Sequence, residues 1–189
     1  KQQLTGQDAL IALASPANRQ GRQVADVLAG INRFNRGSIG SAIVRVFGLT
    51  AASTGLSEAQ AKLANLPIAV VHITGKDHAA YYPGAKDLLL KLIFNPHSGE
   101  IYGAQGIGEK GVDKRIDIIA TAIKGNLTIF DLPELELTYA PPFGSAKDPI
   151  NMLGYAAMNL AEGLSDNIQW HELNSYLAQG YRLLDVRQA

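Results

Sequence analysis

The sequence has no cysteine among its 189 residues. This absence excludes disulfide bonds, thiolate nucleophiles and metal sites built on cysteine. Any sulfur chemistry in which the chain takes part must therefore use a thiol from elsewhere. Four histidines are present, and no two of them have the spacing of paired metal ligands. Because a metal site needs three or four convergent ligands, we predict none.

The sequence also lacks an excess of charge of either sign, since it has 17 basic and 17 acidic residues. Such a chain has no long-range field to attract nucleic acid or acidic lipid, so we predict neither as a partner. It contains no run of about 18 apolar residues and no secretory signal, which predicts no membrane association and a cytoplasmic protein. The first residues lack Met and begin within an apolar segment, which predicts a piece of a longer chain.

Short segments rich in β-branched and small residues predict strands. Residues 38–55 have the pattern of two short strands, and residues 67–75 that of a third. A fourth strand is predicted by alternate apolar residues on one face, namely Leu88, Leu90, Leu92 and Phe94. Turn residues at 95–99 lead into a fifth strand at 100–105, so the last two strands are predicted to form an antiparallel hairpin.

An amphipathic helix is predicted directly after this hairpin. Its apolar stripe has helical spacing and consists of Val112, Ile116, Ile119 and Ile123. Gly125 is expected to end the helix. The charged residues at its start are expected to face water, namely Lys110, Asp113, Lys114 and Arg115.

Three other segments carry helix start signals. Ser15 followed by Pro16 predicts a cap and a first helical position for a helix over 16–29. Ser57 and Gln60 have the spacing of a capping box for a helix over 58–65. Asp148 and Pro149 predict a helix that ends near Gly163. Strands followed by segregated helices indicate an α+β fold, an antiparallel sheet with helices packed on it.

A glycine motif between the hairpin and its helix has the form of a nucleotide-binding turn. Gly106, Gly108 and Gly111 match GxGxxG, and Asp131 follows twenty residues later. The motif requires a parallel strand–helix–strand unit, whereas the preceding strand is predicted to lie in an antiparallel hairpin. Pro133 also interrupts any strand after the helix. We therefore favour a tight strand-to-helix turn and keep a stand-alone NAD-binding enzyme using Gly106 to Gly111 as an alternative.

Three segments together resemble one known family: LASPANRQGRQVADVLAG at 13–30, HAAYYPGAKDLLLKLIFNPHSGEIYGAQGIGEKGVDKRIDIIATAI at 78–123 and YAPPFGSAKDPINMLGY at 139–155. They look like the C-terminal part of flavin-dependent pyridine nucleotide–disulfide reductases. Within that family, the segments resemble the subgroup of coenzyme A-disulfide reductases, NADH-dependent persulfide or polysulfide reductases and NADH oxidases. The resemblance covers about residues 4 to 160.

The resemblance implies a division of the chain into three parts. Residues 1–35 would be the tail of an FAD-binding domain, and residues 36–163 a dimerisation domain that forms a homodimer. Residues 164–189 would be a linker and the truncated start of a rhodanese-like domain, since WHELNSYLAQGYRLLDVR is similar to the opening of such a domain. In this last part the pattern predicts a short helix, a stop at Gly180 and an apolar strand.

The resemblance also implies what this chain does not hold. Full-length family members use FAD and NAD(P)H, and their FAD-binding turn, redox cysteine and nicotinamide domain would lie before Lys1. We therefore expect this chain to bind no cofactor alone and to catalyse no reaction alone. The family's dimerisation domain contributes residues to the active site of the neighbouring subunit.

Two tyrosines match active-site positions of the family. Tyr139 in YAPP corresponds to the residue that reaches the partner's flavin and reactive cysteine, and Tyr81 to the second active-site tyrosine of the coenzyme A subgroup. A phenol with a pKa of about 10 stays protonated at neutral pH and can donate a proton to a leaving thiolate. The alternatives are a packed aromatic at a turn for Tyr139 and a strand-edge aromatic for Tyr81.

Three further residues match contact positions. Lys147 corresponds to a contact of the coenzyme A substrate, and its alternative is a solvated lysine paired with Asp148. Ala17 and Asn18 lie at the start of the helix that approaches the flavin in family members, and Asn18 also matches a substrate contact. Helix N-termini favour the negative charge of a reduced flavin. Ordinary helix initiation is the alternative for both.

Several questions stay open from sequence. The electron acceptor can be coenzyme A disulfide, a persulfide, a polysulfide or oxygen, and the donor NADH or NADPH. A purely structural interaction module, in which Tyr139 has no chemical role, is a further alternative.

Overall fold

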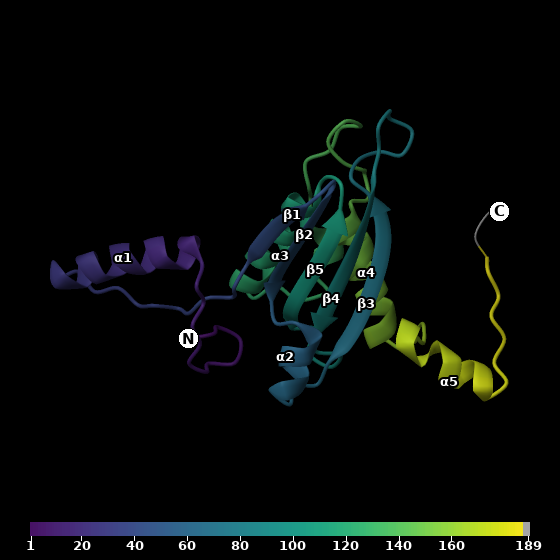
Figure 1. Ribbon diagram of the computed structural model, residues 1–189, viewed down its shortest axis with the longest axis horizontal. Helices are drawn as coiled ribbons and strands as arrows, with labels where there is room; N and C mark the ends of the chain where they lie inside the picture. The colour runs from purple at the N-terminus through teal and green to yellow at the C-terminus, as the bar shows by residue number, and fades with distance from the viewer. Residues whose placement is uncertain (187–189) are drawn as a thin grey trace.

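Five strands form one antiparallel sheet in the computed structural model, which describes residues 1–186 (Figure 1). The strand order across the sheet is β1-β2-β5-β4-β3. The strands are β1 (Ala42–Val46), β2 (Leu49–Gly55), β3 (Ala69–Lys76), β4 (Asp87–Phe94) and β5 (Ile101–Gly108). The predicted antiparallel α+β fold and the β4–β5 hairpin are confirmed.

Two helices cover one face of this sheet, as Figure 1 shows. They are α3 (Val112–Lys124), which lies behind β2 and β5, and α4 (Pro149–Ala161), which lies behind β3 and β4. The other helical segments are α1 (Ala14–Leu28), α2 (Glu58–Leu63), α5 (Leu173–Ala178) and the 3-10 turns η1 (Leu132–Glu134) and η2 (Trp170–Glu172). In Figure 1, α1 and α5 project on opposite sides of the sheet. None of the helices within residues 1–186 is both long and apolar enough to cross a bilayer.

The main core lies between the sheet and the helices α3 and α4. All four predicted inward residues of β4 are buried, as are all four residues of the α3 stripe: Leu88, Leu90, Leu92, Phe94, Val112, Ile116, Ile119 and Ile123. Alternation along a strand and helical spacing put each set on one face, so the two faces bury one another. Periodicity in the sequence was therefore sufficient to predict this layer.

Two local predictions about the ends of the chain are wrong. Helix α1 begins at Ala14 with Leu13 as its N-cap, so Ser15 lies inside the helix and does not cap it. The helix starts earlier because the N–H of Ala17 donates to the carbonyl of Leu13, at 3.2 Å. Pro16 is tolerated because its missing N–H is not needed in the first turn. Residues 181–186 form no strand, since no strand of the described chain pairs with them.

Helix α2 has the predicted capping box and a carboxylate bound by two lysines. The Ser57 hydroxyl accepts from the N–H of Gln60, whose side chain accepts from the N–H of Ser57. Glu58 accepts hydrogen bonds from Lys62 at 2.6 Å and from Lys91 of β4 at 2.7 Å. The lysines lower the pKa of Glu58 to about 2. This cluster ties α2 to the sheet.

Glu58→Gln is expected to remove a pH-dependent part of the stability. The folded pKa of Glu58 lies below its ordinary value of 4.5, so this stabilisation is present above 4.5 and is lost as the pH falls towards 2. At neutral pH the variant should lose on the order of 2 kcal/mol of unfolding free energy, with a flatter acid limb. Urea unfolding at a series of pH values measures both, with Asp8→Asn in the exposed N-terminal segment as control. Parallel pH curves for Glu58→Gln and the unmodified chain would contradict the assignment.

Candidate functional site at the loop end of the sheet

Two loops far apart in the sequence meet at one end of the sheet (Figure 1). One connects β3 to β4 over residues 77–86, and the other precedes α4 over residues 139–148. The N–H of Ala79 in the first loop donates to the carbonyl of Pro141 in the second, at 3.3 Å. The β3–β4 pairing and the packing of α4 behind these strands bring the loops together.

The loops bring the two predicted catalytic residues into direct contact. The hydroxyl oxygens of Tyr81 and Tyr139 are 2.9 Å apart, although the residues are 58 positions apart in the sequence. Tyr81 is 75% exposed and Tyr139 45% exposed. Tyr81 lies outside β3 and β4, so the strand-edge alternative is wrong, and Tyr139 is not packed in the core. Their contact creates a pair of phenols open to an external group.

The contact changes the acidity of Tyr139. The hydrogen bond to Tyr81 raises the pKa of Tyr139 above its ordinary value of 10.0, with a smaller contribution from burial. Tyr139 therefore stays protonated at neutral pH and beyond. One hydroxyl donates to the other, and the second hydroxyl keeps its proton for an outside acceptor. The arrangement can supply a proton to an anion that approaches the loops from solvent.

Tyr81→Phe is expected to lower the pKa of Tyr139 towards its ordinary value, because the largest cause of the upward shift is removed. The titration can be followed by NMR of chains labelled with ¹³C in the tyrosine rings, with Tyr139→Phe used to assign the signal. Tyr102 provides an internal control, because burial raises its pKa and it does not depend on Tyr81. An unchanged Tyr139 titration would show that the two hydroxyls do not interact.

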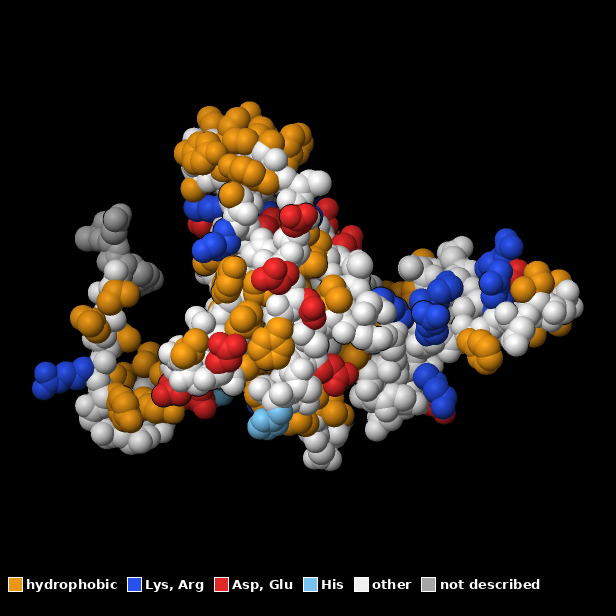
Figure 2. Space-filling model, turned by 180° about the vertical axis from the view of Figure 1, so that it is seen from behind, with side chains coloured by type: hydrophobic (Ala, Val, Ile, Leu, Met, Phe, Trp, Pro, Cys, Tyr) orange, Lys and Arg blue, Asp and Glu red, His pale blue; other side chains and the backbone are white. Residues whose placement is uncertain are grey.

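Hydrophobic side chains gather at this loop end, where the space-filling view shows a projecting apolar cluster (Figure 2). The exposed aromatic residues of the two loops are Tyr81, Tyr82, Tyr139 and Phe143. Concentrated exposed apolar surface on a projecting element marks a contact with another molecule. Phe143, which is 72% exposed, was not predicted as part of the site. Its position directly after the double proline was the only sequence signal for it.

The predicted substrate residue Lys147 lies in the loop of Tyr139, over residues 139–148, and is exposed. Its Nζ is 5.5 Å from the centroid of the Tyr155 ring, within the range of a cation–π contact. The alternative of a solvated lysine agrees with this exposure, but its proposed pair with Asp148 is wrong, because the Asp148 carboxylate is paired with Arg115 and Lys114. The ammonium group of Lys147 therefore remains accessible to an anionic ligand.

Arg115 was predicted to face water, and that prediction is wrong. Its side chain is 1% exposed and donates to Asp148 at 2.7 and 3.2 Å. It also donates to the carbonyls of Asp77 at 2.9 Å and Gly111 at 3.2 Å. The acceptors around it satisfy the buried charge, which explains why an arginine is tolerated there.

The predicted flavin contacts lie apart from the tyrosine loops. Ala17 and Asn18 are exposed on α1, which projects away from the sheet in Figure 1. The Asn18 amide donates to the carbonyl of Ala14 at 3.0 Å. The N–H groups of Ala14 and Ser15 precede the first helical hydrogen bond, so these are the helix donors available to a ligand. The structure does not bring α1 and the tyrosine pair into one site.

The glycine motif lacks the context of a nucleotide-binding turn. Gly106 and Gly108 lie on β5, which is antiparallel to both of its neighbours. A Cβ atom at Gly106 would lie 3.0 Å from Leu90 and from Val112, so this glycine permits close packing of α3 on the sheet. Asp131, the acidic residue that follows the motif in the alternative, accepts hydrogen bonds from Thr128. The geometry supports the tight-turn interpretation.

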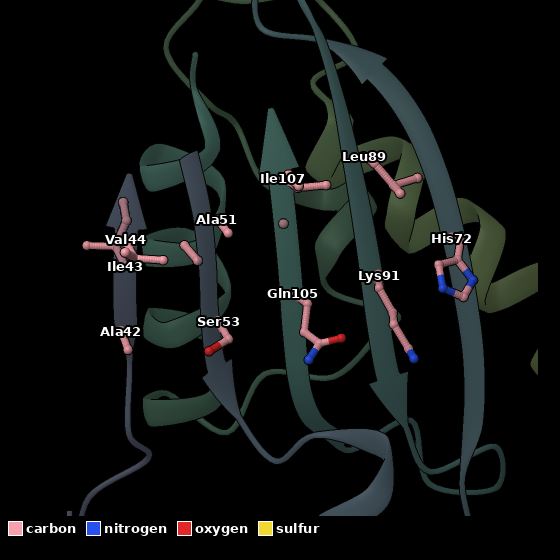
Figure 3. A pocket seen from close by; sticks show the side chains of 12 residues that line it. Ala42, Ile43, Val44, Ala51, Ser53, His72, Leu89, Lys91, Gln105 and Ile107 are labelled. Carbon is pink, nitrogen blue, oxygen red and sulfur yellow. The ribbon is translucent and has the colours of Figure 1, made fainter. Parts of the chain in front are cut away.

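The open face of the sheet carries a hollow of about 530 Å³ lined by all five strands (Figure 3). Apolar residues such as Val44, Leu89 and Ile107 line most of it. Partial burial lowers the pKa of His72, and the positive charge of Lys91 lowers it further. Lys91 is itself paired with Glu58. The hollow thus offers apolar contact, and its charged lining residue Lys91 is already paired.

Within residues 1–186, no three His, Asp or Glu side chains gather as a metal site.

Comparisons with known proteins agree with this fold. Residues 41–148 match the family model of the pyridine nucleotide-disulphide oxidoreductase dimerisation domain. The coenzyme A disulfide reductase of Staphylococcus haemolyticus is 37% identical over 153 residues, which are 80% of this chain and 34% of that protein. The chain thus spans about a third of the length of the curated relatives it matches.

Solved structures give the same result. Reduced Bacillus anthracis CoADR-RHD has a TM-score of 0.93 and 53% identity, covering 95% of this chain and 32% of that chain. An NAD-dependent persulfide reductase from A. fulgidus has a TM-score of 0.85 and 40% identity, covering 88% of this chain and 31% of that chain. Both likenesses extend over most of the chain.

Proposed function

Because the chain belongs to the dimerisation-domain family of the pyridine nucleotide-disulphide oxidoreductases, we propose that it completes the redox site of a partner subunit in a longer flavin-dependent reductase. The observation that carries the proposal is the exposed pair of Tyr81 and Tyr139, with hydroxyl oxygens 2.9 Å apart on a projecting loop end. A proton donor that extends from one subunit suits a reaction centre supplied by another.

The domain division follows from the same proposal. Residues 1–35 are the tail of an FAD-binding domain, residues 36–163 the dimerisation domain and residues 164–189 a linker with the start of a rhodanese-like domain. Of the last part, residues 187–189 lie outside the described residues. A two-fold interface of about 800 Å² or more per subunit is typical of stable homodimers, and the exposed apolar loop end and sheet face offer such surface.

FAD and NAD(P)H are the cofactors of the proposed longer reductase, and the parts of it outside this chain would hold most of their contacts. When bound, these cofactors would supply hydride transfer from the nicotinamide to the flavin and electrons for the reduction of a sulfur acceptor. The start of α1 fits a group that becomes negative on reduction, because the N–H groups of Ala14 and Ser15 are not used within the helix. Ala17 and Asn18 flank these donors on the exposed surface of the helix, where both can contact flavin and Asn18 also substrate.

The residues of this chain act on the acceptor side of the reaction. When a disulfide or persulfide is cleaved, negative charge develops on the departing sulfur. Tyr139, which is protonated at neutral pH, donates its proton to that sulfur, and the Tyr81 hydroxyl donates a hydrogen bond to the Tyr139 oxygen, which then carries the negative charge. The ammonium group of Lys147 attracts a phosphate of a coenzyme A acceptor. Coenzyme A disulfide or a coenzyme A persulfide is therefore the acceptor class that we favour.

Steady-state kinetics of the full-length protein test this function. NAD(P)H oxidation should depend on coenzyme A disulfide or persulfide. Lys147→Gln should raise KM for these acceptors by about three- to tenfold, with little change in kcat, because a single exposed charge contact is lost. Lys62→Gln, which removes a charge that is 61% exposed on α2, is the control. An equal effect of both substitutions, or turnover that ignores coenzyme A acceptors, would contradict the proposed acceptor class.

A further inference from the structure

We propose that Arg115 is the positioning residue that holds the two tyrosine loops in register, so that Tyr81 and Tyr139 reach hydrogen-bonding distance. The inference rests on the proposed function, and it assigns a role to a residue that touches neither substrate nor cofactor. Its basis is that one buried guanidinium group binds the start of the first loop and the end of the second.

The contacts of Arg115 connect the loops at their bases. Its Nη2 donates to the backbone carbonyl of Asp77, at 2.9 Å, where the first loop leaves β3. The same nitrogen donates to Oδ2 of Asp148 at 2.7 Å, and Nε donates to Oδ1 at 3.2 Å, where the second loop enters α4. Arg115 itself is anchored on α3 beneath the sheet. A displacement of its guanidinium group therefore moves both loop bases relative to the core.

Hydrogen bonds hold each loop base in place, so the position of the base determines where its tyrosine lies. The N–H of Asp77 donates to the carbonyl of Lys86, and the N–H of Lys86 donates back to Oδ1 of Asp77, which closes the first loop. Asp148 caps α4 by accepting from the N–H of Ile150, and the Asn151 side chain accepts from the N–H of Asp148. Since both bases are hydrogen-bonded in this way, the guanidinium group between them sets their spacing, and the Ala79–Pro141 hydrogen bond joins the loops farther out.

Only a planar, forked cation fits this position. Arg115 uses three nitrogens toward three residues, whereas a lysine has a single ammonium on a flexible stem. Gly111, at the end of the glycine motif, has φ +73, and a Cβ atom there would lie 2.5 Å from Nη1 of Arg115. The third glycine of the motif is therefore explained by the space that the guanidinium group occupies.

Other charged groups close to Arg115 do not make the same contacts. Lys114 is 3.9 Å from Oδ2 of Asp148 and is partly exposed, so it contributes a weaker and more screened contact. His78 contacts the carboxylate of Asp77 through Nδ1 at 2.9 Å, on a different atom from the carbonyl that Arg115 binds. Among the described residues, Arg115 is thus the group whose contacts span the bases of both loops.

The test uses Arg115→Lys, which keeps the charge, and Asp148→Asn, which keeps a capping side chain for α4. In the full-length protein each should lower kcat/KM by about tenfold or more, as small displacements of reacting groups do. In the labelled chain each should lower the pKa of Tyr139 towards its ordinary value, as Tyr81→Phe does. Adding Arg115→Lys to Tyr139→Phe should slow turnover by no more than about twofold beyond Tyr139→Phe alone, because Arg115 acts through the position of Tyr139. Arg45→Lys, on the exposed edge strand β1, is the matched control.

The outcomes separate this inference from the proposed function. If Tyr139→Phe slows turnover but Arg115→Lys and Asp148→Asn do not, Arg115 has no positioning role. The same holds if the losses from Arg115→Lys and Tyr139→Phe multiply, or if the Tyr139 titration is unchanged in both variants. If Tyr139→Phe alone leaves turnover unchanged, the proposed function fails, and the titration of the chain still decides whether Arg115 sets the tyrosine contact.

Discussion

Replacing Tyr139 with Phe in the full-length protein is expected to lower kcat/KM for the disulfide or persulfide acceptor by about 10²- to 10⁴-fold, the usual contribution of a positioned general acid. The substitution removes one oxygen and leaves the ring, so the loop keeps its packing. Reduction of the flavin by NAD(P)H should proceed at its normal rate, because Tyr139 acts only when negative charge develops on sulfur. Stopped-flow and steady-state measurements distinguish the two half-reactions.

Tyr82→Phe is the matched control for this prediction. Tyr82 neighbours Tyr81 in the same loop and is 42% exposed, but it is not a member of the hydroxyl pair. We expect its loss to change the rate by no more than about twofold. Equal rates for the Tyr139→Phe variant and the unmodified protein would contradict the proposed chemistry and favour a purely structural interaction module.

Arg115→Met is expected to destabilise the chain by about 3 to 5 kcal/mol, the range found when one partner of a buried ion pair is removed. The loss arises because Asp148, 2% exposed, would keep its charge without the guanidinium group that now donates to both of its oxygens. Chemical denaturation monitored by circular dichroism measures the change in the unfolding free energy.

A second substitution tests the reason for this loss. Asp148→Asn in the Arg115→Met background removes the buried charge and keeps a helix cap, so it should recover part of the lost stability. The double variant should therefore be more stable than Arg115→Met alone. The account is wrong if the stability losses of Arg115→Met and Asp148→Asn add in the double variant, or if Arg115→Met leaves the unfolding free energy unchanged. Either result would show that the buried ion pair does not stabilise this region.

Periodicity in the sequence predicted the parts of the fold that depend on local repeats. Alternate leucines fixed the inward face of β4, and helical spacing fixed that of α3. The capping box of Ser57 and Gln60 and the cap at Asp148 were also predicted, because each uses residues within three positions of one another. Ser15 failed as a cap because a serine before a proline can equally lie inside the first turn.

The position of Arg115 shows why charge alone misleads. It lies three positions after Val112 and four before Ile119, which is the spacing of the buried stripe, so helical geometry placed it on the inner face. A charged residue at such a position requires buried partners. The spacing therefore indicates that Arg115 needs a buried partner. It does not identify Asp148 as that partner, because the contact joins α3 to the start of α4.

The tyrosine pair was only partly predictable. The family resemblance pointed to Tyr81 and Tyr139 individually, whereas their contact follows from the order of the strands and from the packing of α4 on β3 and β4. No local pattern encodes a distance between residues 58 positions apart. The exposed Phe143 beside them carried no periodic signal, because loops lack the repeat on which such predictions depend.

The central claim, that this domain supplies its tyrosines to the neighbouring subunit, can be tested by mixing two inactive full-length variants. One carries Tyr81→Phe and Tyr139→Phe, and the other lacks the redox cysteine that the proposed FAD domain would carry. Random subunit exchange makes half of the dimers mixed, each with one complete site, so the account predicts about a quarter of normal activity. Mass spectrometry verifies the exchange. Mixed dimers without activity would show that each subunit uses its own tyrosines, contrary to this account.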